Sequence, residues 1–232
     1  MRHNDWYLRD DEEEFGEALH RRTEELYNVP DTTPDEEGLI ECPVLPLRDL
    51  IVFPHMVSPV FLSQESAILA VEDAQMNDQT VIALTQRDPE LDEPGPDDFF
   101  PVGVEMAVGR LLSMPDDSSS ALVQGRRRVE IVEFVQEEPF LVVRARPIYE
   151  AVEVDRQVDA TMRSALEMFH KCVQLDRSLP EEAYLYALNI DEPGWLADMI
   201  TTAIAPPTAE RQELLLLTDP MERLRSLLNL LA

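Results

Sequence analysis

The sequence predicts an α+β protein: a mostly antiparallel β-lobe that contains one helix, followed by an α-helical bundle. Between residues 42 and 148 the dominant hydrophobic periodicity is two, as expected for strands that bury one face. After Glu150 the period changes to 3.6, which indicates amphipathic helices. We therefore expect an acidic, mobile leader over 1–40, a β-rich lobe over 41–150 and a helical bundle over 151–232.

The β-rich lobe is expected to hold about six strands and one helix. We expect the strands over residues 44–47, 56–62, 81–84, 104–108, 121–135 and 140–148. Ser63 is the expected cap of a helix over 64–76, and the acidic, proline-punctuated run 88–98 reads as a loop. Gly125 marks a bulge, because a lone glycine in a strand pattern often does.

Five helices are expected in the second part of the chain. They begin near residue 158 and run to about 177, and then cover 181–189, 191–206, 208–217 and 219–232. Thr208 and Asp219 are expected N-caps, and Pro220 follows the second cap at the first helical position. The last helix has a coiled-coil-like seam at Met221, Leu224, Leu228 and Leu231. It reaches Ala232 without a stop signal, so we expect a truncated helix at the front of a longer protein.

The charge balance excludes several classes of protein. Forty-seven acidic residues against nineteen basic ones give a formal charge of −28. Nucleic acids and anionic lipids are bound largely through cationic groups, so neither is an expected partner. The chain has no apolar run of the ~18 residues that a membrane helix needs and no apolar signal core. Two cysteines are too few for a disulfide framework, which favours the cytoplasm.

The sequence gives no sign of catalysis, a cofactor or a metal. Its only lysine, Lys171, follows His170, whereas a phosphate-binding P-loop needs lysine after glycine. A Ser–Lys dyad would have to use the same lysine, and no Gly-x-Ser-x-Gly elbow occurs. His170 and Cys172, and likewise His55 and Cys42, lack the spacing of metal ligands.

One basic cluster and two apolar loops remain as candidate binding features. Strand alternation splits Arg126, Arg127 and Arg128 between two faces, which favours surface ion pairs over nucleic-acid binding. Methionine and aromatic side chains can dock varied apolar segments, or they can close the core. The candidate contact residues are Leu50, Phe53, His55, Met56, Met114 and Pro115.

A series of short motifs occurs in a fixed order over residues 41–231. The β-rich half contains PVLPLRD (43–49), IVFPHM (51–56), PVF (59–61), QRDPE (86–90), DDFFPVG (97–103), VQG (123–125) and EEPF (137–140). The helical half contains DEPGWLAD (191–198) and ERQELL (210–215). In this order the motifs resemble the N-terminal domain of Lon, the ATP-dependent protease. The leader is longer than the family commonly has, Asp116–Ser118 lacks the usual glycine, and the ATPase and Ser–Lys protease modules are absent.

The resemblance implies a PUA-like β-lobe and a non-catalytic role in substrate recognition and assembly. Clients would be unfolded proteins and proteins that bear exposed degradation signals. The partner would be the rest of a Lon-type protease, which is a homohexamer, and ATP and Mg²⁺ would bind in the missing ATPase module. Two alternatives are a stand-alone adaptor with this domain and no protease, and RNA binding, which PUA-like lobes perform elsewhere but which the charge disfavours.

Overall fold

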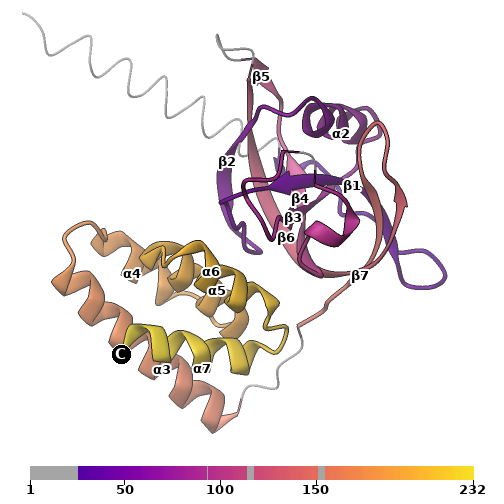
Figure 1. The fold of residues 1–232 in the computed structure, drawn as a ribbon. Helices are drawn as coiled ribbons and strands as arrows, with labels where there is room; N and C mark the ends of the chain where they lie inside the picture. The colour runs from indigo at the N-terminus through magenta and orange to yellow at the C-terminus, as the bar shows by residue number, and fades with distance from the viewer. Residues whose placement is uncertain (1–25, 93, 114–117, 151–154) are drawn as a thin grey trace, which may run out of the picture.

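The computed structural model describes residues 26–92, 94–113, 118–150 and 155–232, and it has two lobes (Figure 1). The β-lobe contains β1 (Ile40–Leu47), β2 (Val57–Leu62), α2 (Glu65–Met76), β3 (Val81–Thr85), the short 3₁₀ helix η1 (Pro96–Asp98), β4 (Val102–Val108), β5 (Leu112–Ser113), β6 (Ser119–Gln136) and β7 (Val142–Pro147). The helical lobe contains α3 (Arg156–Leu175), α4 (Glu181–Ala187), α5 (Pro193–Ile204), α6 (Thr208–Leu216) and α7 (Pro220–Leu231). The predicted α+β class is confirmed.

The strands of the β-lobe form one sheet that closes on itself. Their order is β2-β6-β4-β3-β1-β7, and β5 pairs with β6. The long strand β6 pairs with β4 on one side and with β7 further along, which completes a ring. All pairings are antiparallel except that of β1 with β3. The prediction of a mostly antiparallel lobe is therefore correct.

The bulge predicted at Gly125 is present in β6. Gly125 lies opposite Met106 and Arg127 lies opposite Glu105, so Arg126 is the extra residue between them. The glycine itself is required by a close approach, since a Cβ atom there would overlap the carbonyl oxygen of Phe53. The two segments are joined there by hydrogen bonds of 2.8 and 2.9 Å from the amides of His55 and Gly125.

Hydrophobic packing follows the predicted periodicities in most elements. All five residues of β3 are buried, and in β7 Val143 and Ala145 are buried whereas Arg144 and Arg146 are not. In α3, residues spaced three and four apart are buried on one face, at Val158, Met162, Ala165 and Phe169. On α7 the buried apolar residues are Pro220, Leu224 and Leu227. Of the predicted seam only Leu224 is fully buried, whereas Met221, Leu228 and Leu231 pack at the edge of the core.

Two predicted helix caps are wrong and one is right. Ser63 does not cap α2, because the helix begins at Glu65 after Gln64, which makes no side-chain cap. Thr208 is the first residue of α6, and its hydroxyl donates to the carbonyl of Asp49. Asp219 caps α7, where one carboxylate oxygen accepts hydrogen bonds from the next two available backbone amides.

The lobes share a hydrophobic core. Leu214 and Leu215 of α6 belong to the same cluster of buried side chains as Val104 and Met106 of β4. In the helical lobe, α7 packs against both α3 and α5, as Figure 1 shows for α3 and α7. The helical part of the sequence therefore completes the core of the β-lobe.

Candidate functional site

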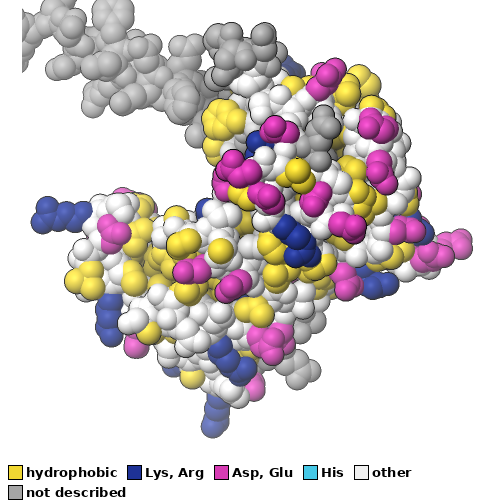
Figure 2. Space-filling model, in the orientation of Figure 1, with side chains coloured by type: hydrophobic (Ala, Val, Ile, Leu, Met, Phe, Trp, Pro, Cys, Tyr) yellow, Lys and Arg dark blue, Asp and Glu magenta, His cyan; other side chains and the backbone are white. Residues whose placement is uncertain are grey.

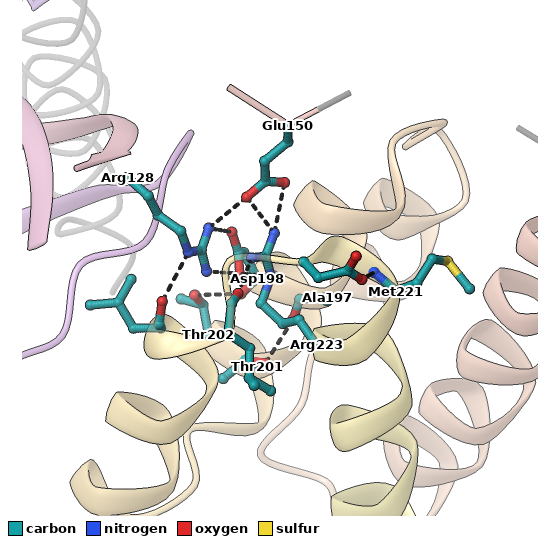
Figure 3. A network of polar contacts seen from close by, with 11 residues as sticks. Arg128, Glu150, Ala197, Asp198, Thr201, Thr202, Met221 and Arg223 are labelled. Carbon is teal, nitrogen blue, oxygen red and sulfur yellow. Dashed lines mark hydrogen bonds and ion pairs between the residues drawn. The ribbon is translucent and has the colours of Figure 1, made fainter. Parts of the chain in front are cut away.

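A network of four charged side chains, three of them buried, joins the two lobes (Figure 3). Arg128 of β6 donates to both carboxylate oxygens of Asp198 on α5, at 2.7 and 2.8 Å. Arg223 of α7 donates to both oxygens of Glu150, at 2.6 and 2.7 Å. Cross contacts close the square: Arg128 also reaches Glu150 at 3.2 Å, and Nε of Arg223 lies 3.1 Å from Asp198. Two arginines and two carboxylates make the network formally neutral.

Three of the four members are buried, and Glu150 is exposed. Arg128, Asp198 and Arg223 are each at most 1% exposed. Burial acts to lower the pKa of the Arg128 guanidinium, but the charge and hydrogen bonds of Asp198 and the charge of Glu150 outweigh it and raise this pKa. Each arginine also donates one hydrogen bond to a backbone carbonyl of α6 or the turn after it, Arg128 to Leu215 and Arg223 to Leu217. Removal of one partner would leave a buried charge unpaired.

The predicted surface role of the Arg126–Arg128 cluster is wrong for Arg128, which is internal. Arg126 donates to the carbonyls of Leu26 and Val29. Arg127 donates to Glu105, whose side chain is fully buried, and to the carbonyl of Thr32. The bulge explains the error, because it breaks the alternation on which the prediction rests. These contacts hold residues 26–32 against the sheet, where Leu26 is 0% exposed.

The predicted contact loop at residues 50–56 lies where the two lobes meet. Phe53 is 1% exposed, so its ring offers no surface to a client in this conformation. Leu50 is half-buried on the core of the β-lobe. Met56 packs against the cores of both lobes, and His55 is exposed. The other two predicted contact residues, Met114 and Pro115, lie outside the residues that the structure describes.

The helical lobe adds aromatic side chains to this loop. The ring of His55 lies on Trp195, with centroids 4.9 Å apart, and Tyr186 meets the same indole edge-on at 6.3 Å. His55 adopts a positive φ of 64°, which turns the chain so that Met56 can enter the junction. We call His55, Met56, Tyr186 and Trp195 the junction surface; half of Tyr186 is exposed. Tyr186 and Trp195 were not among the contact residues predicted from the sequence. The available signal was the run of apolar residues around Tyr186, in which Leu185 and Leu188 are exposed in the structure.

Acidic side chains are common on the surface of the β-lobe. Figure 2 shows carboxylate side chains spread over the β-lobe on the face in view, with fewer Lys and Arg side chains, several of which project from the helical lobe. A field of this sign disfavours anionic partners.

The remaining candidate ligands are occupied by structural contacts. The Cys42 thiol is buried beside the Thr32 and Thr80 hydroxyls, and burial raises its pKa to about 11. His170 stacks on Tyr184 with centroids 4.3 Å apart. Within the described ranges, no three His, Cys, Asp or Glu side chains are grouped to hold a metal ion. None of the helices in this part of the chain is long and apolar enough to cross a membrane.

Comparisons with known proteins agree with the fold. Residues 41–232 match the family described as the ATP-dependent protease La (LON) substrate-binding domain. The chain is 37% identical over 188 residues to "Lon protease 2" of Herpetosiphon aurantiacus, and this match covers 81% of the chain but 23% of the relative. It is 34% identical over 192 residues to "Lon protease" of Heliobacterium modesticaldum, covering 83% and 24%. The chain thus spans about a quarter of the length of these curated relatives.

Solved structures show the same fold. The N-terminal domain of Mycobacterium avium complex Lon protease matches with a TM-score of 0.69 at 24% identity, over 82% of this chain and 97% of that one. A Lon N-terminal domain protein from Xanthomonas campestris matches with a TM-score of 0.56 at 16% identity, again over 82% and 97%. With the family match over most of its length, the chain belongs to the substrate-binding domains of the Lon proteases.

Proposed function

We propose that this chain captures client proteins for an ATP-dependent Lon-type protease and cleaves nothing itself. Its clients would be unfolded proteins and proteins with exposed degradation signals. The proposal is supported by the family description, which names substrate binding, and by relatives called Lon protease that are about four times longer than the match. ATP and Mg²⁺ binding, peptide-bond cleavage and assembly into a cytoplasmic hexamer would involve the remainder of such a protein.

The junction surface is the observation that supports client binding most directly. Segments of unfolded chains are recognised by their exposed apolar side chains, and adaptable methionine and aromatic groups can accommodate varied sequences. Met56, Tyr186 and Trp195 provide such groups at one place. Because they come from both lobes, the surface exists only in the folded arrangement, so a client would contact both lobes rather than one loop.

A binding assay with a permanently unfolded polypeptide tests the proposal. A reduced, alkylated and fluorescently labelled protein should bind the chain without nucleotide, whereas its native form should not. Tyr186→Asp should weaken capture roughly tenfold, since it places a charge beside Trp195. Val132→Asp is the matched control, because Val132 is a similarly exposed side chain on β6, 45% against 50%. Equal capture of native and unfolded forms would refute client recognition. Equal effects of the two variants on capture would show that the junction surface does not bind the client.

The absence of catalysis is tested on the same preparation. We expect neither cleavage of the unfolded polypeptide nor ATP turnover by the purified chain, because its single lysine follows a histidine rather than a P-loop glycine. Mass spectrometry of the native gene product distinguishes the protease from the adaptor alternative. A product of about the length of the relatives supports the protease, and a product that ends near residue 232 supports the adaptor.

A further inference from the structure

A groove on the β-lobe lies apart from the junction surface. Strand β1 pairs with β7 only from Ile40 to Pro43, and beyond that point it keeps β3 as its neighbour. The turn between β6 and β7, residues 137–141, extends past the end of this pairing. The first turn of α2 together with Asp92, Pro94 and Gly95 forms the opposite wall, and the space between them is about 910 Å³. This volume is at the upper end of the ~300–1,000 Å³ typical of ligand sites.

The lining of the groove is apolar at several positions contributed by separate elements. The apolar lining residues are Val44, Pro46, Leu69, Pro139, Phe140 and Leu141. Phe140 and Leu141 are half-buried and Pro139 is exposed, so the turn presents apolar surface to the space rather than closing it. Proline at position 46 also removes one backbone donor from β1. The groove therefore offers apolar contacts, chiefly from the turn before β7, beside polar and charged side chains from α2 and its neighbours.

The charged groups around this apolar lining are mostly acidic. Glu65, Glu137 and Glu138 are exposed and form no ion pair with any residue that the structure describes. The single cation of the lining, Arg48, is paired with Asp92 at 3.1 Å. With Arg48 neutralised by Asp92, the lining keeps three unpaired negative charges. Such a rim attracts cations and repels carboxylates and phosphates.

We propose that this groove binds an extended client segment in which apolar side chains are flanked by lysine or arginine. The inference rests on the proposed function and refines it, because it assigns a second client contact and a sequence preference. The apolar lining takes the hydrophobic side chains, and Glu65, Glu137 and Glu138 pair with the flanking cations. The acidic run at residues 10–14 of the same chain has the wrong charge to occupy it.

Three labelled peptides with one apolar core test the preference by fluorescence polarisation. The core is flanked by lysine in the first peptide, by serine in the second and by glutamate in the third. We expect the lysine peptide to bind tightest, the glutamate peptide weakest, and the difference to shrink as salt is raised, because the rim charges are exposed. Glu137→Gln/Glu138→Gln should weaken the lysine peptide roughly three- to tenfold and leave the serine peptide unchanged.

Controls separate this inference from the proposed function. Glu167→Gln/Glu213→Gln makes the same charge change at two exposed positions of the helical lobe and should leave all three affinities unchanged. A photo-crosslinker in the lysine peptide should label residues 137–141, which localises binding even if a variant misfolds. Equal affinities for the three peptides, or equal effects of both double variants, would overturn the groove assignment while client binding at the junction stands. Failure of every peptide and of the unfolded polypeptide would overturn both.

Sedimentation of the free chain checks the competing occupant. We expect a monomer whose sedimentation coefficient does not change with Phe140→Asp. A dimer that this substitution dissociates would show that a second copy of the chain fills the groove, and it would refute peptide binding there.

Discussion

Replacement of Arg128 by methionine tests whether the buried charge network joins the lobes into one cooperative unit. The substitution preserves a long apolar side chain but removes four hydrogen bonds, two to Asp198 and one each to Glu150 and Leu215. Asp198 then keeps only the 3.1 Å contact with Nε of Arg223. Because Asp198 is 1% exposed, its charge has no compensating hydration.

Removal of one member of a buried ion pair costs about 3–5 kcal/mol. In a protein of this size 1 kcal/mol corresponds to about 2–4 °C in Tm, so we expect Arg128→Met to lower Tm by roughly 6–20 °C. Differential scanning calorimetry measures this shift. It also shows whether one transition splits into two, as expected if the lobes then unfold separately.

Two further variants make the result specific to the network. Arg146→Met removes an ion pair with Glu130 of similar length, 3.1 Å, in which both side chains are more than half exposed, and it should cost about 0–1 kcal/mol. Arg128→Met/Asp198→Leu removes both charges of one pair and should recover at least half of the single variant's loss. The coupling between the four charges would be refuted if Arg128→Met lowered Tm no more than Arg146→Met. It would also be refuted if the loss of stability in the double variant equalled the sum of the losses in the two single variants.

Three other substitutions or measurements probe the fold. Gly125→Ala should cost roughly 1–3 kcal/mol in urea unfolding, because its Cβ would meet the carbonyl of Phe53; an unchanged midpoint would argue against this close approach. Leu26→Ala should lower the free energy of unfolding by about 2–4 kcal/mol. A neutral result would show that residues 26–39 do not pack against the sheet. Burial raises the Cys42 pKa to about 11 from an unperturbed 9.0, so its stabilising contribution is complete below pH 9 and is lost towards pH 11. At pH 8 a thiol reagent should therefore label Cys172 first, and equal labelling of Cys42 would contradict its burial.

The fold was predictable from the sequence wherever local patterns agree with the final packing. The face of α3, the alternation in β7 and the Asp219 cap all depend on neighbours within one element. Ring closure through β6 depends instead on pairings between residues as distant as Val129 and Pro147 or Val102 and Glu130. No single-strand pattern contains that information. Ser63 and Thr208 were wrong as caps because hydroxyl residues near a helix start have other uses, such as the bond from Thr208 to Asp49.

The charge network had a signal that periodicity alone does not interpret. Asp198 stands between Ala197 and Met199 in an apolar helix, and Arg223 occupies a core-facing position of α7. A charge on a buried face requires a partner, so these two residues predict buried pairing, but not with which residue. The alternation expected across Arg126, Arg127 and Arg128 leaves out the bulge predicted beside them, and with that shift of one residue Arg128 faces the interior. The junction surface could not be predicted from local patterns either, since His55 and Trp195 are 140 positions apart and meet only in the tertiary fold.

The use of arginine explains how so acidic a chain can present apolar surfaces. In β6, Arg126, Arg127 and Arg128 are all bound to backbone carbonyls or carboxylates of the same molecule. Arg144 of β7 likewise binds Asp35 and Glu37. Because these cations are neutralised internally, the excess carboxylates determine the sign of the surface. Two copies then repel each other while their apolar surfaces remain open, and a segment that carries lysine or arginine beside its apolar side chains is attracted.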